Sequence, residues 1–84
     1  MDKQAVLQAL NEIYVDVLDN EEIVLSPETV AADIEEWDSL SHIQLIVSVE
    51  KHFKLQFKTQ EVQEFANVGS ICDAILVRVN AELG

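Results

Sequence analysis

Apolar residues recur at helical intervals in three separate stretches of this 84-residue chain, and no other feature constrains its fold as strongly. The spacing predicts helices over about residues 3–18 and 39–53 and a last helix that begins near Val68. The repeated apolar positions are Val6, Leu10, Ile13, Val17, Leu40, Ile43, Leu45, Ile46, Val47, Phe53, Val68, Ile71, Cys72, Ile75, Val79 and Leu83. On each predicted helix these positions form one apolar stripe. We expect the stripes to build an adaptable, mainly aliphatic core, because few residues are aromatic.

The segments between these helices carry signals of their own. Residues 19–38 are predicted to form a structured loop with one short turn at Ser26. Residues 54–58 alternate like a strand, but a lone strand would leave its backbone groups unpaired, so we expect an extended crossing segment. The residues predicted to cap the second, the short and the last helix are Asp38, Thr59 and Asn67. The predicted fold class is all-α, a small helical bundle of three main helices plus one short helix.

Length and charge limit the classes of function. A chain of this length that is 49% hydrophobic should form a single domain over residues 1–84. Its net charge of −11 opposes binding to nucleic acid and to anionic membrane surfaces. Most of this charge lies in residues 1–38, whereas residues 39–84 are nearly neutral. No apolar stretch approaches the roughly 18 residues that a membrane-spanning helix needs, so we expect no membrane insertion.

The cysteine and histidine content predicts neither a disulfide nor a metal site. Cys72 is the one cysteine and should be an inert core residue. The N-terminus lacks the features of a secretory signal, which favours the cytoplasm, and we expect a monomer. His42 and His52 have no second ligand at metal-binding spacing, and both are expected at the surface. The acidic runs lack the ligand pattern of a calcium loop, so no metal is predicted.

The most informative residue is Ser39, which falls in the first turn of the second helix between Asp38 and Leu40. The free N–H groups and partial positive charge at a helix N-terminus favour a phosphate esterified there. His42 lies three residues further on, but no oxyanion hole or orienting carboxylate accompanies the pair, so we predict no catalytic residues. The simpler interpretation of Ser39 is an ordinary serine that follows a helix cap.

Asp-Ser-Leu is followed by a pattern of residues, namely Ile43, Leu45, Ile46, Glu50, Phe53, Val68 and Gly69. Together with the length, the acidity and the long first loop, this pattern resembles an acyl carrier protein over nearly the whole chain. The resemblance implies that Ser39 carries 4'-phosphopantetheine from coenzyme A, whose thiol holds acyl groups as thioesters between enzymes. It implies that Asp38 and Leu40 help a phosphopantetheinyl transferase to recognise the serine. It also implies a carrier rather than an enzyme.

The same resemblance implies contacts with acyl-loading and acyl-transferring enzymes, through the second helix and the loop before it. The residues expected in these contacts are Glu35, Glu36, Trp37, Ile43, Gln44 and Val47. Trp37 could also pack the loop onto the bundle, which we favour, or line the exit of the arm. His42 could touch the phosphate of the arm, although a position facing solvent is expected. The adaptable core is expected to shelter part of an acyl chain.

The chain departs from the members of this family that serve fatty acid biosynthesis. Those members commonly have Gly-Ala before Asp-Ser-Leu and acids at the positions of Ser41, Gln44 and Lys51, whereas this chain has Glu36-Trp37 and a nearly neutral second helix. Their partner enzymes present basic patches, so the departures favour a specialised lipid or polyketide pathway. Two alternatives stay open, an aminoacyl or peptidyl carrier of a nonribosomal system and an acidic helical adaptor that is never modified.

Overall fold

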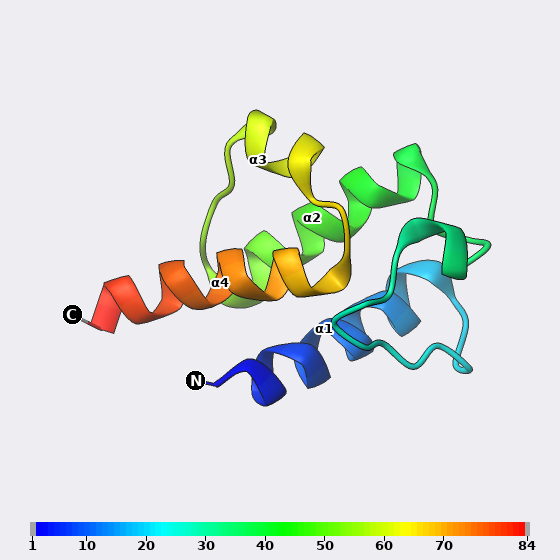
Figure 1. The fold of residues 1–84 in the computed structure, drawn as a ribbon, viewed down its shortest axis with the longest axis horizontal. Helices are drawn as coiled ribbons and strands as arrows, with labels where there is room; N and C mark the ends of the chain where they lie inside the picture. Colours follow the sequence, from blue (N-terminus) through cyan, green and yellow to red (C-terminus); the bar gives the residue numbers. More distant parts are fainter. Residues whose placement is uncertain (1, 84) are drawn as a thin grey trace.

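The computed structural model describes residues 2–83, which form four α-helices and one 3-10 turn without a strand (Figure 1). These elements are α1 (Lys3–Leu18), η1 (Ala31–Asp33), α2 (Ser39–Phe53), α3 (Thr59–Glu64) and α4 (Val68–Leu83). The all-α prediction and the predicted bounds of the first two long helices are confirmed. Helix α1 packs against both α2 and α4, whereas α3 lies at the side of the bundle away from α1 (Figure 1). None of the helices in the described chain is long and apolar enough to cross a membrane.

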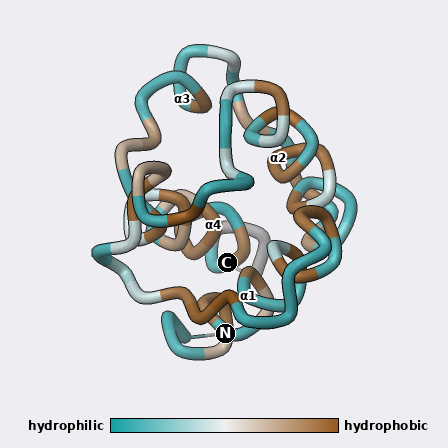
Figure 2. Tube along the Cα trace, turned by 90° about the vertical axis from the view of Figure 1, so that its right-hand side faces the viewer, coloured by the Kyte–Doolittle hydropathy of each residue, from teal (hydrophilic) through white to brown (hydrophobic). Residues whose placement is uncertain are grey.

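The core lies where the three long helices meet. Hydrophobic and hydrophilic stretches alternate along each helix, as expected for amphipathic helices (Figure 2). The buried core residues are Val6, Leu10, Ile13, Tyr14, Leu18, Ile23, Leu25, Trp37, Leu45, Ile46, Val49, Leu55, Val68, Ile71, Cys72 and Ile75. Val17, Phe53 and Val79 are partly buried and pack against this core, and the side chain of Leu83 lies outside the described residues.

One predicted apolar stripe of α2 does not face the core. Leu40, Ile43 and Val47 are 69%, 59% and 42% exposed, whereas Leu45 and Val49 on the opposite side are each 1% exposed. Helix α2 is apolar on two faces, and α1 covers only one of them. All apolar positions of α2 were predicted to build the core, and this prediction is wrong for Leu40, Ile43 and Val47.

Local side-chain hydrogen bonds set most helix starts. The N–H of Ser70 donates to Asn67 Oδ1 at 2.9 Å, which confirms the predicted cap of α4. The predicted cap of α3 is wrong, because Thr59 is already the first helical residue and Lys58 occupies the cap position. The carboxylate of Glu61 reaches back and accepts a hydrogen bond from the Lys58 N–H at 3.1 Å. A favourable interaction with this acid in the first turn explains why α3 begins one residue earlier.

The loop over residues 19–38 contains more structure than the one predicted turn. The Thr29 N–H donates to Ser26 O at 3.1 Å, which closes the expected turn, and η1 (Ala31–Asp33) follows it. The side-chain amide of Asn11 bonds the loop to α1, since its Oδ1 accepts from the Leu25 N–H at 2.7 Å. The loop is thus fastened to the bundle by polar contacts with residues far away in the sequence.

The same loop is joined to the start of α4. The Val68 N–H donates to Thr29 O at 2.9 Å, and the Gly69 N–H donates to Pro27 O at 2.8 Å. A Cβ atom at position 69 would lie 2.9 Å from this Pro27 carbonyl oxygen, closer than side chains normally approach. Glycine is therefore required here for the close approach of two backbones, and these bonds satisfy free N–H groups in the first turn of α4.

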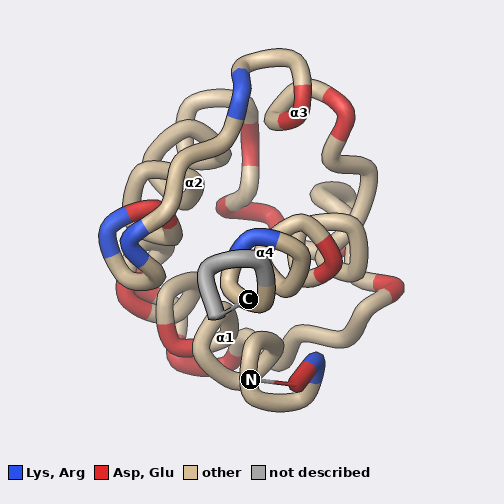
Figure 3. Tube along the Cα trace, turned by 90° about the vertical axis from the view of Figure 1, so that its left-hand side faces the viewer, with Lys and Arg blue, Asp and Glu red and all other residues tan. Residues whose placement is uncertain are grey.

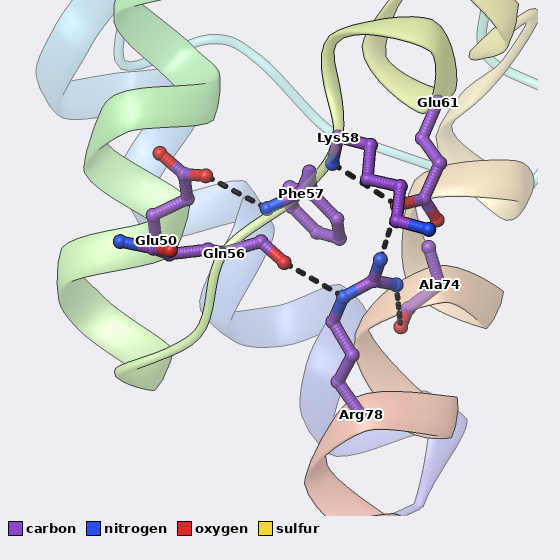
Figure 4. A network of polar contacts seen from close by, with 7 residues as sticks. All are labelled: Glu50, Gln56, Phe57, Lys58, Glu61, Ala74 and Arg78. Carbon is purple, nitrogen blue, oxygen red and sulfur yellow. Dashed lines mark hydrogen bonds and ion pairs between the residues drawn. The ribbon is translucent and has the colours of Figure 1, made fainter.

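Helix α3 is held mainly by polar and aromatic contacts, because none of its side chains is fully buried. Figure 4 shows Arg78 of α4 at the centre of this network. Its Nε donates to Gln56 O at 2.8 Å, its Nη2 pairs with Glu61, and its guanidinium lies 4.7 Å from the centre of the Phe57 ring. The Phe57 ring in turn packs edge-on against Phe65. One arginine thus ties the crossing segment and α3 to α4.

Replacing Arg78 with glutamine should loosen α3 without unfolding the bundle, because the three long helices keep their core contacts. We expect amide hydrogen exchange of Val62 and Phe65 to become roughly 5- to 30-fold faster, as the loss of one or two kcal/mol of local stability implies. Lys51→Gln, which removes one exposed positive charge from α2, should leave these rates unchanged. Equal exchange in the Arg78 and Lys51 variants would contradict the assigned role of Arg78.

Candidate functional site

Ser39 is the first residue of α2, and its side chain is exposed. Asp38 precedes it in an extended conformation, with a φ of −120°, so the chain turns into the helix at this point. No side-chain hydrogen bond between residues of the described chain involves Ser39. Its hydroxyl is therefore free to be approached from solvent by another molecule, as the sequence indicated.

The side chains of Asp38 and Ser41 form a reciprocal cap at the start of α2, in the same turn as Ser39. The Ser41 N–H donates to Asp38 Oδ1 at 2.9 Å, and the Asp38 N–H donates to Ser41 Oγ at 2.8 Å. The Ser41 hydroxyl also donates to Glu36 O at 2.8 Å. The Ser41 N–H, and then the Ser41 hydroxyl, lower the pKa of the Asp38 carboxyl below its ordinary value of 3.8. The cap predicted for α2 is confirmed, and it engages the hydroxyl of Ser41 but not that of Ser39.

The lowered pKa of Asp38 predicts how the stability of the fold should depend on pH. Because the pKa of Asp38 is lower in the folded protein, its contribution is fully present above about 3.8 and is lost as the pH falls through the folded value. Asp38→Ala should therefore lower the melting temperature at pH 7, and the difference from wild type should shrink towards pH 2. Asp38→Asn retains a capping oxygen and should restore much of the stability at pH 7. A difference between Ala and wild type that does not change with pH would contradict this role.

A cleft of about 390 Å³ opens beside Ser39, between the loop, α2 and α3. Ile43, Val62 and Phe65 give it apolar walls, and Trp37 and His42 line it as well. The two rings of Trp37 and His42 are stacked, with an interplanar angle of 26° and centroids 5.9 Å apart. The exposed hydroxyl thus lies at the edge of a mainly apolar groove that is large enough to take part of a flexible chain.

Trp37 and His42 form a hydrogen-bonded chain that reaches α3. The Trp37 Nε1–H donates to His42 Nδ1 at 3.1 Å, and His42 Nε2 lies 3.2 Å from Val62 O. Since an indole N–H can only donate, Nδ1 must accept, and we assign the imidazole proton to Nε2, which then donates to Val62 O. Both nitrogens of His42 are thereby engaged, so the prediction that it faces solvent is wrong. Its contact with Val62, twenty residues away, could not be inferred from spacing along one helix.

The other residues singled out in the sequence lie either in the core or at the surface. Trp37 is 6% exposed and packs edge-on against Tyr14 at 5.1 Å, so the predicted packing role is confirmed and its ring is not available on the outer surface. Cys72 is fully buried, as predicted, and burial raises the pKa of its thiol. His52 is exposed as expected. The predicted contact residues that lie exposed around Ser39 are Glu35, Glu36, Leu40, Ile43, Gln44 and Val47.

Acidic positions outnumber basic ones around the molecule (Figure 3). The loop before Ser39 carries Glu35 and Glu36, whereas α2 itself has one acid, Glu50, beside the base Lys51. In the described part of the chain, no group of three or more His, Cys, Asp or Glu side chains is arranged to hold a metal ion. The surface beside the serine is therefore acidic on the loop and apolar on the helix.

Comparison with known proteins identifies the class to which this fold and site belong. Residues 8–75 match the family described as a phosphopantetheine attachment site. The chain belongs to the acyl carrier protein family. It is similar to the acyl carrier protein of Rubrobacter xylanophilus, with 29% identity over 76 residues that cover 90% of this chain and 94% of that protein.

Solved structures agree with this assignment. The solution NMR structure of a holo acyl carrier protein from Geobacter metallireducens is 45% identical, covers 93% of this chain and 90% of its own, and superposes with a TM-score of 0.87. A candidate acyl carrier protein from Mycobacterium tuberculosis is 24% identical, covers 86% of this chain and 96% of its own, and has a TM-score of 0.77, which shows a shared fold.

Family membership defines the cofactor and the general activity. The cofactor is a covalently attached 4'-phosphopantetheine, whose thiol holds acyl groups as thioesters. The protein is a carrier rather than a catalyst, and it is served by a phosphopantetheinyl transferase and by acyl-handling enzymes. An exposed hydroxyl at a helix start, with an apolar cleft beside it, suits a group that is a phosphoester at one end and a flexible chain beyond.

Proposed function

We propose that Ser39 is the residue that carries the phosphopantetheine arm, and that the protein is an acyl carrier of a specialised lipid or polyketide pathway. The observation that supports Ser39 is the contrast between two hydroxyls of the same turn. Ser39 is exposed and unbonded within the described chain, whereas Ser41 is engaged with Asp38 and with Glu36 O. A transferase can reach the first hydroxyl without breaking the cap of α2.

The neighbouring residues have distinct roles in this proposal. Asp38 keeps its charge and holds the first turn of α2, so the backbone that carries the exposed Ser39 hydroxyl is fixed in place. Leu40 is 69% exposed directly beside it and offers an apolar contact to the transferase. Ile43 and Val62 line the cleft in which the arm, or the start of its cargo, is shielded from water.

The surface of α2 supports the choice of a specialised pathway. Its exposed stripe of Leu40, Ile43 and Val47 is apolar, and Gln44 within it is uncharged. A partner enzyme that binds here gains more from burying apolar area than from pairing basic residues with α2. Acidic residues of the preceding loop, Glu35 among them, would steer the approach of a partner at low salt. We propose a cytoplasmic monomer with one domain over residues 1–84.

The proposal is tested by intact mass. Purified apo protein is incubated with coenzyme A, magnesium and a promiscuous phosphopantetheinyl transferase, and its mass is measured before and after. We expect a gain of one phosphopantetheine, and fragmentation should place the added group on Ser39. A gain on another residue would refute the site. No gain in a folded protein would instead support the unmodified adaptor.

Loading assays separate the remaining candidate functions. Holo protein that accepts acyl groups from an acyl-activating enzyme, but not aminoacyl groups from adenylating enzymes, would support the lipid or polyketide pathway. Efficient aminoacylation would favour the aminoacyl or peptidyl carrier. Because both kinds of carrier share the arm, only the cargo that the partner enzymes deliver distinguishes them.

A further inference from the structure

The hydroxyl of Tyr14 is buried without a hydrogen-bond partner in the described chain. Tyr14 is 1% exposed, and its hydroxyl is the one buried side-chain polar atom of the described residues that finds no partner. Burial, and to a smaller extent the neighbouring thiol of Cys72, raises the pKa of this phenol, so it keeps its proton and stays a donor. Leaving such a donor unpaired destabilises the fold, and phenylalanine would fill the same space without that cost.

The position of Tyr14 connects it to the site of the arm. Its ring packs edge-on against Trp37, with centroids 5.1 Å apart. Trp37 lines the cleft beside Ser39, where it stacks on His42. The Trp37 and His42 pair thus forms the inner wall of the cleft, and Tyr14 belongs to the core behind that wall.

His42 joins this wall to α3. His42 reaches α3 through a single hydrogen bond, from Nε2 to Val62 O at 3.2 Å. Helix α3 has six residues and no fully buried side chain. Helix α3 is also attached through Arg78, at Glu61 and at the crossing segment, and Phe65 at its end packs edge-on against Phe57. A chain that enters the cleft between α2 and α3 meets Trp37, and it reaches Tyr14 only when the Trp37 ring moves aside.

We propose that the Tyr14 hydroxyl donates a hydrogen bond to an oxygen on the acyl cargo, so that this carrier favours acyl groups with a hydroxyl or carbonyl oxygen along the chain over fully saturated ones. The inference rests on the proposed attachment of the arm at Ser39. Apolar residues such as Ile43 and Phe65 bind the hydrocarbon part of such a cargo. The one unpaired donor behind them adds a preference for an oxygen, because its hydrogen bond is formed only by a cargo that brings an acceptor.

The experiment compares three cargoes that differ only in one oxygen. Stable amide-linked pantetheine analogues carrying hexanoyl, 3-hydroxyhexanoyl or 5-hydroxyhexanoyl groups are attached to wild type and to Tyr14→Phe, and intact mass verifies loading. Failure to load at Ser39 would contradict the proposed function and would be seen at this step. The melting temperature of each loaded protein is then measured, so the preference is tested separately from attachment.

In wild type, at least one hydroxylated cargo should raise the melting temperature above that of the hexanoyl form by roughly 4 to 8 °C. In Tyr14→Phe this difference should disappear, while the unloaded variant should melt at the same temperature as unloaded wild type or higher. Equal melting temperatures for all three loaded wild-type forms would overturn the proposal. A difference that persists in Tyr14→Phe would also overturn it, because the oxygen would then bind elsewhere.

A spectroscopic readout reports on the hydroxyl itself. Tyr14 is the only tyrosine of the chain, so a 13C label in the tyrosine ring gives one signal for the carbon that bears the hydroxyl. This signal should shift when a hydroxylated cargo replaces hexanoyl, since the hydroxyl then gains an acceptor. An identical signal in the hexanoyl form and in both hydroxylated forms would contradict the hydrogen bond, whatever the melting temperatures show.

Discussion

The Ser39→Ala protein is expected to gain no phosphopantetheine under conditions that convert all of the wild type. The expected loss is complete because the arm is joined through the hydroxyl oxygen, which alanine lacks. The fold should be unaffected, since Ser39 is exposed and the cap of α2 is made by Asp38 and Ser41. Intact mass measures the modification, and the melting temperature checks that the variant is folded.

Ser41→Ala is the matched control, because it removes the other hydroxyl of the same helical turn. This variant loses the hydrogen bonds of Ser41 Oγ with the Asp38 N–H and with Glu36 O, so it should melt at a lower temperature. It should nevertheless accept one arm, since the Ser39 hydroxyl is intact. If folded Ser41→Ala were not modified while Ser39→Ala was, the assignment of the site would be reversed.

Leu45→Ala should have the largest effect on stability. Leu45 of α2 is 1% exposed in the hydrophobic core, and removing its side chain leaves a cavity as well as lost burial. Such changes cost about 2 to 5 kcal/mol. The free energy of unfolding of a chain of this length is only about 4 to 12 kcal/mol, so the substitution should remove a large part of the protein's stability. Urea unfolding followed by circular dichroism measures the change.

Leu40→Ala makes the same substitution on the same helix and serves as the control. Leu40 is 69% exposed, so the free energy of unfolding of the Leu40→Ala variant should differ from that of wild type by no more than about 0.5 kcal/mol. Its effect should appear instead in a slower transfer of the arm to Ser39, because Leu40 contacts the transferase in the proposed function. Similar losses of stability in the Leu40 and Leu45 variants would mean that the two faces of α2 have been assigned incorrectly.

The helix bounds and the modified turn could be predicted because local interactions decide them. Asp38 caps α2 through the N–H of Ser41, only three residues away, and apolar spacing marks α1 over residues 3–18. The exposure of Ser39 follows from the same local geometry. Where a second local interaction competes, the prediction is off by a residue, as at Thr59, where the carboxylate of Glu61 caps from inside the helix.

Other features depend on contacts between distant segments. The apolar pattern of α2 has two faces, and only packing against the rest of the bundle decides that Leu45 is buried while Ile43 is exposed. His42 was expected in solvent, but the carbonyl of Val62 and the indole of Trp37 engage both of its nitrogens. These partners come from α3 and from the loop, so no periodicity within α2 could indicate them.

The sequence by itself therefore determined the class of fold, the long helices and the serine at the start of α2, because spacing and capping act within a few residues along the chain. The tertiary structure alone decided which apolar face of α2 is buried, how Trp37 and His42 wall the cleft, and that the Tyr14 hydroxyl lacks a partner. The physical reason is that burial and hydrogen-bond pairing depend on neighbours in space, and for a small bundle those neighbours come from other helices.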